Sequence, residues 1–371
     1  MRRRKQAGMF ESIRKKYLIY LKGGIHKRRR PETGHGAAFL IIQFDSLGDV
    51  CTLLPVIRKL KERGYTLNVL CREDLAPLWR YFFPDLQIFT IARDSWSPDI
   101  LANTTARLKG LAYEAIFAVT ISPLAAYLAA FVPASRRYGM IERRYFKGAR
   151  WLYDAVYPAE PNEFIIRRFI GLFSLHIPEF YSVQIGDGIL EPVTGGEYIL
   201  VHPGGKWKPR RWPAERFLRV ANELARAGYP VRILVHESEK DLLAAFRDER
   251  LVRGASVWVT RTIADLIRAV KKGILLLGND SGPVHLAKLF GLPAVVLWGP
   301  GNSARIHPLG TGNIFLRKDV PCRPCRQYIH PERCEQGENI CLQKITVQEV
   351  LEAVSEQLND PGPSFIPPDV K

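Results

Sequence analysis

The segment Gly278–His285 has the composition of an anion-binding turn. It follows the apolar run 274–277 and leads into a helix over 284–290, so it marks the passage from a buried strand into a helix. The free amides of a first helical turn attract negative charge, and Gly282 lets a ligand approach the backbone. The segment predicts a phosphate-binding site, with an ordinary tight turn as the alternative. The candidate residues are Asn279, Asp280, Ser281, Gly282 and His285.

Two carboxylates stand close together after the first predicted strand, Phe39–Phe44. The loop that follows spans 45–49 and precedes a helix over 50–63. A carboxylate at a helix start usually serves as a cap, but two acids in five residues exceed what capping requires. A carboxylate that faces a cleft can remove a proton from a hydroxyl group, so we expect one of the two to act as general base. The loop residues of interest are Asp45, Ser46, Gly48 and Asp49.

A Gly-Gly turn with four cations ends the strand that begins at Tyr198. His202-Pro203-Gly204-Gly205 is followed by Lys206, Lys208, Arg210 and Arg211. Positive side chains after such a turn suit a pyrophosphate, and a solvated basic loop is the alternative. An acidic residue after the next strand, 231–235, is placed to bond ribose hydroxyls. The candidates for donor binding here are Gly204, Gly205, Lys206, Arg210 and Glu239.

Four of the six cysteines form a late cluster with the spacing C-x2-C-x8-C-x6-C in a loop rich in Pro and Arg. In a cytosolic protein this spacing favours a metal site over disulfides. Four thiolates would suit structural zinc or an iron–sulfur cluster, and two disulfides or free thiols are the alternatives. The residues are Cys322, Cys325, Cys334 and Cys341.

The elements that must position these residues alternate between apolar runs and helical segments, which predicts an α/β fold with doubly wound parallel sheets. The 371 residues exceed the usual size of a single core, so we expect two domains. A Gly-rich stretch at 186–197 marks the linker. The predicted parts are a basic arm at 1–36, an N-terminal Rossmann-like domain at 37–185, a C-terminal Rossmann-like domain at 198–358 that includes the cysteine cluster, and a Pro-rich tail at 359–371.

The net charge of +17 is concentrated in the arm 1–36, which holds twelve Lys and Arg against two Glu and so carries +10, leaving +7 for the other residues. Phe10, Ile13, Tyr17 and Leu21 are spaced as the apolar stripe of a short amphipathic helix. Such a basic helix is suited to an anionic membrane surface. A solvated tail or a nonspecific nucleic-acid arm is the alternative, and we favour the membrane.

The apolar segment 115–133 is long enough to be mistaken for a membrane span. Pro123 divides it, and it is better explained as a strand followed by a helix, so no transmembrane helix is expected. The chain also lacks the GxGxxG and GxxxxGK[ST] motifs, which disfavours a dehydrogenase or an NTPase. It contains no Asp-x-Asp pair, so a divalent metal held by such a pair is not indicated.

Together these segments resemble the heptosyltransferases, the family-9 glycosyltransferases that build the lipopolysaccharide inner core. The motifs that carry the resemblance are Phe44–Val50, His202–Trp207, Arg210–Pro213, Gly278–His285 and Leu297–Pro300, and they extend through residues 39–358. The resemblance implies the GT-B fold, in which two Rossmann-like domains face each other across a cleft and the last helix returns towards the first domain. Asp45 stands where relatives commonly have Ser or Arg, and the arm is additional to the family core.

The resemblance also implies a reaction. Asp49 matches the base that deprotonates the acceptor, Arg210 the phosphate-binding lysine, Glu239 the ribose carboxylate and the segment 280–285 the diphosphate loop. The donor would be ADP-heptose, the acceptor a lipopolysaccharide-core glycolipid, and the transfer inverting and metal-independent. This implies a cytoplasmic enzyme on the inner face of the cytoplasmic membrane that needs no cofactor for transfer.

Two other functions fit the same residues. A nucleotide-sugar 2-epimerase with this fold would convert the donor without an acceptor. A non-enzymatic adaptor that binds membrane or nucleic acid through residues 1–36 would need neither the acidic loop at 45–49 nor the predicted phosphate-binding segments.

Overall fold

The structure is a computed structural model. It describes residues 38–92, 98–111, 113–142, 147–193, 195–247, 250–322, 325 and 334–359. The predicted arm at 1–36 and the tail beyond 359 lie outside the described residues.

The first half of the described chain forms a parallel six-stranded sheet. Its strand order is β3-β2-β1-β4-β5-β6. The strands are β1 (Ala38–Gln43), β2 (Leu67–Arg72), β3 (Gln87–Ile91), β4 (Tyr113–Ala118), β5 (Ala134–Glu142) and β6 (Ala155–Ala159). The helices are α2 (Leu47–Glu62), α3 (Ala76–Phe82), α4 (Pro98–Lys109), α5 (Pro123–Phe131) and α6 (Ile165–Ser174), with short 3-10 turns η1 (Glu73–Leu75), η2 (Lys147–Leu152) and η3 (Pro178–Ser182).

The second half repeats this topology in the sheet β12-β11-β10-β7-β8-β9, which is also parallel. Its strands are β7 (Tyr198–His202), β8 (Val231–His236), β9 (Ala255–Thr260), β10 (Gly273–Asn279), β11 (Ala294–Trp298) and β12 (Asn313–Arg317). Its helices are α7 (Ala214–Arg226), α8 (Lys240–Ala245), α9 (Ile263–Val270), α10 (Gly282–Leu289), α11 (Ile340–Gln343) and α12 (Val347–Asn359), with the 3-10 turn η4 (Lys208–Arg210).

Continuous apolar strands explain why both sheets are buried on two faces. In β1, Leu40, Ile41 and Ile42 are fully buried although successive side chains point to opposite faces. Ile41 belongs to the core under α2 and α6, whereas Leu40 and Ile42 belong to the core under α5. Strands with apolar residues on both faces require helices on both sides, which is the doubly wound arrangement.

The prediction of two Rossmann-like domains of the GT-B class is therefore confirmed. The apolar segment after residue 112 forms β4 and α5, with Pro123 at the first position of the helix, where its missing amide leaves no bond unmade. Within the described ranges, no helix is long and apolar enough to cross a membrane.

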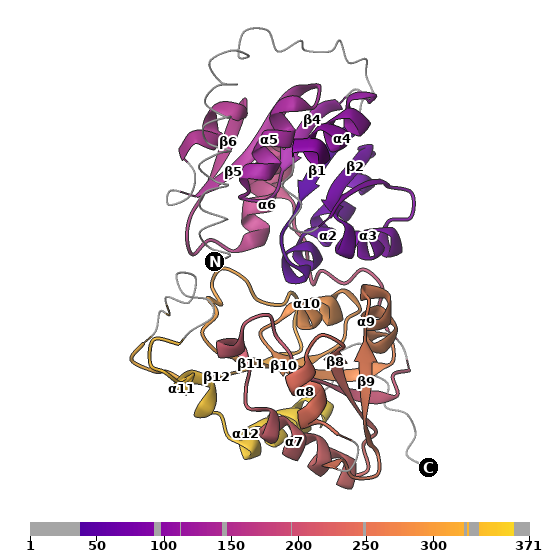
Figure 1. Cartoon of the computed structure of the whole chain (residues 1–371), viewed down its shortest axis with the longest axis vertical. Coiled ribbons are helices and arrows are strands. Elements are labelled where there is room, and N and C mark those ends of the chain that lie inside the picture. The colour runs from indigo at the N-terminus through magenta and orange to yellow at the C-terminus, as the bar shows by residue number, and fades with distance from the viewer. Residues whose placement is uncertain are drawn as a thin grey trace.

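The last helix differs from the expectation that it returns towards the first domain. α12 packs against α7 and against strands β10, β11 and β12 of the second sheet. Its buried residues, which include Val350 and Val354, belong to the core of that sheet. In Figure 1, α12 and α7 lie at the far end of the second half, away from the first sheet. Apolar burial on its own sheet explains why α12 stays with the second domain.

The two halves meet through helices that start at the carboxyl ends of their sheets. Figure 1 shows α2 and α3 on the side of the first half that faces α9 and α10 of the second. A β-carbon on Gly48 would lie 3.0 Å from the Cδ2 atom of His285, and one on Gly282 would lie 2.9 Å from the Cβ atom of Leu47. The starts of α2 and α10 therefore touch, and only glycine allows this approach.

Candidate functional site

The candidate residues lie where each sheet reverses its winding. In each sheet the strand order changes direction between two central strands, β1 and β4 in the first and β7 and β10 in the second. Chains leaving these neighbouring strands in opposite directions open a crevice at the carboxyl edge, where α/β proteins bind ligands. Contact between α2 and α10 brings the two edges together, so the predicted acceptor and donor segments share one junction.

Asp49 lies in the first turn of α2 and not in the loop before it. Ser46 is the N-cap, and Asp49 Oδ2 accepts hydrogen bonds from the backbone amide of Ser46 at 3.1 Å and from its hydroxyl at 2.5 Å. This S-x-x-D cap fixes the carboxylate at the helix start. Both bonds go to one oxygen, and Oδ1 has no donor within the part of the chain that the structure describes. Asp49 therefore caps the helix and still offers an oxygen to a ligand.

Asp45 is the second carboxylate of this loop, and it is partly buried. The Thr120 hydroxyl, at the end of β4, donates to Asp45 Oδ1 at 2.8 Å. Burial and then the negative charge of Asp49 raise the pKa of Asp45 to about 7, against the opposing influence of Thr120 and of the Arg305 cation. The negative charge of Asp49 therefore favours the protonated form of Asp45 near neutral pH.

Replacing Asp45 by Asn should therefore stabilise the protein at high pH. A carboxyl whose pKa is raised on folding binds more protons in the native state, so its contribution to stability falls as the pH rises from about 4 to about 7. Asn escapes this loss and still accepts the bond from Thr120. We expect a gain on the order of 2 kcal/mol in the free energy of unfolding at pH 8, and little at pH 4.

Urea denaturation at pH 4 and pH 8 measures this difference. Asp85→Asn is the control, because the ammonium group of Lys61 lowers the pKa of Asp85 on the surface and its replacement should cost a few tenths of a kcal/mol at pH 8. An Asp45→Asn gain of equal size at both pH values would show that ionisation of Asp45 is not its cause.

Asp280 and Arg210 form an ion pair on the donor side of the junction. Asp280 is almost fully buried, and the Arg210 guanidinium donates to its Oδ2 at 3.2 Å. Burial raises the pKa of Asp280, the charge of Arg210 opposes this, and the negative charge of Asp49 adds to it. Arg210 also lies over the Trp207 ring, 4.7 Å from its centroid, and the Lys206 ammonium group lies 5.5 Å from the same centroid. The Trp207 ring thus contacts both cations, and Arg210 reaches Asp280, the residue before the cap of α10.

α10 starts directly at this ion pair. Ser281 is its N-cap, Gly282 its first residue and Pro283 its second. Pro283 has no amide hydrogen, and the Val284 amide donates to the Ser281 carbonyl oxygen at 3.2 Å, so among the described residues the Gly282 amide is the helix-start donor left for an anion. His285, one turn further, is buried, and burial lowers its pKa to about 4, with the charges of His307 and Arg210 acting in the same direction. The imidazole is therefore neutral at pH 7 and packs against Gly48 of α2.

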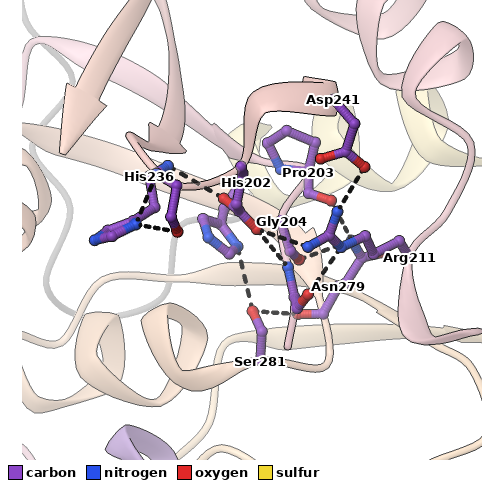
Figure 2. Close-up of polar contacts among 11 residues, drawn as sticks. His202, Pro203, Gly204, Arg211, His236, Asp241, Asn279 and Ser281 are labelled. Carbon is purple, nitrogen blue, oxygen red and sulfur yellow. Dashed lines mark hydrogen bonds and ion pairs between the residues drawn. The ribbon is translucent and has the colours of Figure 1, made fainter. Parts of the chain in front are cut away.

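Asn279 joins the two donor-side loops. Its side chain donates to the carbonyl oxygens of Pro203 at 2.9 Å and Gly204 at 3.2 Å, and its Oδ1 accepts from the amide of Trp212 at 2.9 Å. Figure 2 shows Asn279 between the turn after β7 and the end of β10, with Ser281 beside His202. Asn279 is fully buried, and its side-chain amide forms its hydrogen bonds with other protein groups. It therefore supports the two loops of the site and does not contact a ligand itself.

Glu239 lies against the glycines of the same turn. Its Oε1 accepts from the amide of Gly205 at 3.3 Å and from Arg211 at 3.0 Å, and its Oε2 accepts from the amide of His236 at 3.1 Å. A β-carbon on Gly204 would lie 2.7 Å from both carboxylate oxygens, which explains the glycine. Arg211, predicted as one of four phosphate cations, instead links Glu239 to Asp241 (Figure 2). Arg210 stays next to α10 through its ion pair with Asp280.

His202 lies behind Glu239 at the end of β7. It is buried, and burial lowers the pKa of its imidazole to about 4, an effect that Glu239 opposes and Arg211 increases. Its Nδ1 lies 3.3 Å from the hydroxyl of Ser281. A neutral His202 therefore connects the turn after β7 with the cap of α10, without adding a charge to the donor side.

The cysteine cluster does not form the expected metal site. The described residues contain no group of three or more His, Cys, Asp and Glu side chains that could hold a metal ion. Cys322 and Cys334 are free thiols, so the alternative of two disulfides among these four cysteines is not met within the described residues. Cys341 is buried in the second core and Cys322 packs against it, which gives both an apolar packing role.

Sequence reasoning missed two residues at the junction. Thr120 could have been found, because it follows β4 and the switch point of a Rossmann sheet lies between the strands equivalent to β1 and β4. Arg305 has no such signal, since its place beside Asp45 depends on how the two domains meet.

Comparisons with known proteins identify the family of the chain and proteins that share its fold. The profile of glycosyltransferase family 9 (heptosyltransferase) matches residues 102–335, which is more than half of the chain. Lipopolysaccharide heptosyltransferase 1 of Pseudomonas aeruginosa is 22% identical over 303 residues, which cover 77% of this chain and 85% of the relative.

Two solved structures share the fold. A family-9 glycosyltransferase from Veillonella parvula superposes with a TM-score of 0.73 at 17% identity and covers 88% of this chain and 99% of its own. The E. coli heptosyltransferase WaaC with ADP-2-deoxy-2-fluoro heptose superposes with a TM-score of 0.65 at 18% identity, covering 86% and 99%.

Proposed function

Because the chain belongs to glycosyltransferase family 9, the heptosyltransferase family, we propose that it transfers a heptose from ADP-heptose to a lipopolysaccharide-core acceptor. Two facts about relatives support the donor and the acceptor class. A Pseudomonas relative is a lipopolysaccharide heptosyltransferase, and a solved structure of the same fold holds an ADP-heptose analogue.

The observation that carries the proposal is the placement of Asp49. Among the described residues none donates to its Oδ1, and the residue lies at the helix start that touches the start of α10. A hydroxyl of the acceptor would donate to this oxygen, and the proton would pass to Asp49 as the acceptor oxygen bonds the anomeric carbon. Attack from this side, opposite the diphosphate, gives inversion at that carbon.

The leaving group would be ADP, which departs through an oxygen of its β-phosphate. In this proposal the bond from the anomeric carbon to that oxygen breaks, and the electron pair goes to the diphosphate. Arg210, Lys206 and the Gly282 amide at the start of α10 stabilise the developing charge, while Gly204 and Gly205 leave room for the backbone to approach the phosphates. In metal-dependent transferases a bound cation stabilises the negative charge of the leaving diphosphate. Here the positive groups of the protein would do this, so we propose metal-independent transfer. Glu239 binds the ribose hydroxyls, and Asp45, Ser46 and Gly48 line the acceptor side.

The test is a reaction of the purified protein with ADP-heptose and a deacylated lipopolysaccharide-core oligosaccharide that lacks heptose. We expect release of ADP with an equal amount of heptosylated product, unchanged by EDTA, and an inverted anomeric configuration by NMR. Omitting the oligosaccharide separates the alternatives, because conversion of the nucleotide sugar without an acceptor would favour the 2-epimerase. UDP- and GDP-sugars in place of ADP-heptose test the choice of donor.

We further propose that the enzyme acts at the inner face of the cytoplasmic membrane and that residues 1–36 attach it to anionic lipid. The support is the charge of +10 on this segment and the spacing of its apolar residues. Deleting 1–36 should weaken co-sedimentation with phosphatidylglycerol vesicles and leave transfer to the deacylated oligosaccharide intact. Unchanged vesicle binding would reject this role for the arm.

A further inference from the structure

One side chain from the late part of the chain holds the backbone on both sides of Arg210. The side-chain amide of Asn339 donates to the carbonyl oxygen of Pro209 at 3.2 Å and to that of Arg211 at 2.8 Å. An amide nitrogen carries two hydrogens, so these two bonds use both of its donors. Arg210 lies between the two bonded residues. Asn339 therefore fixes the piece of backbone from which the Arg210 side chain extends.

Asn339 is the N-cap of α11, but its side chain does not cap this helix. Asn is favoured at such a position because its side-chain oxygen usually accepts a bond from an amide of the first turn. Among the described residues no such bond is present, and the amides of Leu342 and Gln343 donate to the Asn339 backbone carbonyl instead. The side chain thus bonds to the turn η4 and leaves its own helix uncapped.

The helix α11 is a fixed base for this contact, because the chain just after it is tied to the second domain. The Arg216 guanidinium donates to the carbonyl oxygen of Ile345 at 2.7 Å, and the indole of Trp212 donates to the same oxygen at 3.0 Å. Within the helix, Leu342 is fully buried in the core of the second sheet. The position of Asn339 is therefore set by the packing of α11 as well as by η4.

The same helix also lies against the loop after β11. A β-carbon on Gly299 would lie 2.9 Å from the Cδ1 atom of Leu342, so this loop passes directly over α11. A β-carbon on Gly301, two residues further, would collide with Oδ2 of Asp280, the ion-pair partner of Arg210. α11 thus supports the turn that carries the cation and the loop that contacts its partner.

Three contacts together define where the Arg210 charge lies. The guanidinium donates to Asp280 Oδ2 at 3.2 Å and lies 4.7 Å from the centroid of the Trp207 ring, while Asn339 holds the backbone. A cation stabilises a leaving diphosphate best when it is in place before the reaction, because moving it during the reaction costs free energy. A misplacement of about 1 Å can lower a rate by about 100-fold.

We propose that Asn339 is a positioning residue of the donor site, which holds η4 so that the Arg210 guanidinium meets the diphosphate of the nucleotide sugar. The inference rests on the proposed function, because it assumes that Arg210 binds this diphosphate. Without the two bonds, η4 is free to shift and the cation loses its place. The loss should then concern the diphosphate and spare both the nucleoside and the acceptor.

The experiment compares wild type with Asn339→Ala in transfer from ADP-heptose and in the inhibition of this transfer by ADP and by adenosine. We expect kcat/KM for ADP-heptose to fall by about 10- to 100-fold and the inhibition constant of ADP to rise by about 5- to 50-fold. The inhibition constant of adenosine and the acceptor KM should stay within about threefold. Asn339→Gln keeps the amide on a longer side chain and should fall between the two, which provides a second variant if Asn339→Ala does not fold.

A double-variant cycle with Arg210→Gln identifies the group that Asn339 positions. In the Arg210→Gln background, Asn339→Ala should lower kcat/KM by less than about threefold, because the cation is already gone. Asn222→Ala is the matched control. The Asn222 side chain also bonds to backbone, to the carbonyl oxygen of Arg250 at 3.0 Å and the amide of Val252 at 3.2 Å, but before the amino end of β9. It should keep kcat/KM within about twofold, and both single variants should lower the melting temperature by no more than about 4 °C.

Two outcomes would overturn the inference. A wild-type kcat/KM in a folded Asn339→Ala or Asn339→Gln enzyme would show that the two bonds do not position the cation. Equal losses with and without Arg210 would show that Asn339 acts on another group or on the fold as a whole. If wild type transfers no sugar from ADP-heptose, the proposed function fails together with the inference, and this result is distinct from the other two.

Discussion

Asp49→Asn should lower kcat for heptosyl transfer by roughly 10³-fold and leave the affinity for ADP within about twofold. Asn has the shape of Asp and can still accept both bonds from Ser46, so the cap of α2 persists. What it loses is the basicity of the oxygen that faces the junction. Initial rates with saturating acceptor give kcat, and isothermal titration gives the dissociation constant of ADP.

The choice of variants separates catalysis from capping. Ser46→Ala removes the hydroxyl donor to Asp49 Oδ2 but keeps the carboxylate, so we expect a loss of only about three- to tenfold, with a small drop in stability. Asp74→Asn removes an exposed carboxylate that pairs with Arg72 and should have no effect on kcat beyond twofold. If Asp49→Asn loses ADP binding together with turnover, Asp49 belongs to the donor site and is not the base.

The sequence predicted the parts of the site that depend on local order. Apolar runs identified the strands, and loops at their carboxyl ends must meet at one edge of a parallel sheet. This reasoning predicts that the segments of Arg210 and Asp280 meet at one edge of the second sheet, whereas only the resemblance to the GT-B fold implied that Asp49, on the first sheet, faces them. It erred by one turn at α2, where Ser46 caps the helix and Gly48 and Asp49 are helical. The small polar residues there suit a loop and a helix cap equally well.

Features that depend on distant contacts could not be predicted. The contact between Gly48 and His285 joins two domains, and nothing in either motif encodes it. The same holds for Arg305, whose neighbours Ile165 and Asp45 are more than a hundred residues away. The cysteines show the opposite error, because a spacing typical of metal ligands is used in this fold without a metal-binding arrangement of the described residues.

Arg210 contributes both to donor binding and to the stability of the protein. Arg210→Gln should lower kcat/KM for ADP-heptose by about 10²- to 10³-fold, because the negative charge that develops on the leaving diphosphate loses the main cation that stabilises it. It should also destabilise the protein by about 2 kcal/mol at pH 8, since it leaves the buried carboxylate of Asp280 without its ion pair. Steady-state kinetics and urea denaturation measure the two effects separately.

The pH dependence of the Arg210→Gln variant gives the mechanism of its destabilisation. Burial already raises the pKa of Asp280, and removing Arg210 raises it further. The native state then binds more protons than the unfolded state, so the stability of the variant falls as the pH rises and recovers as the pH is lowered. The control Arg250→Gln, which breaks an exposed pair with Glu215, should cost less than 1 kcal/mol.

A double variant divides the two roles. In Arg210→Gln/Asp280→Asn the buried charge is gone, so we expect stability to return to within about 1 kcal/mol of wild type and the additional pH dependence of the single variant to disappear. Transfer should not recover, because neutral side chains cannot stabilise the departing diphosphate. If the double variant regained turnover along with stability, Arg210 would serve only to neutralise Asp280. The positive charge that stabilises the leaving diphosphate would then have to come from Lys206 and the start of α10.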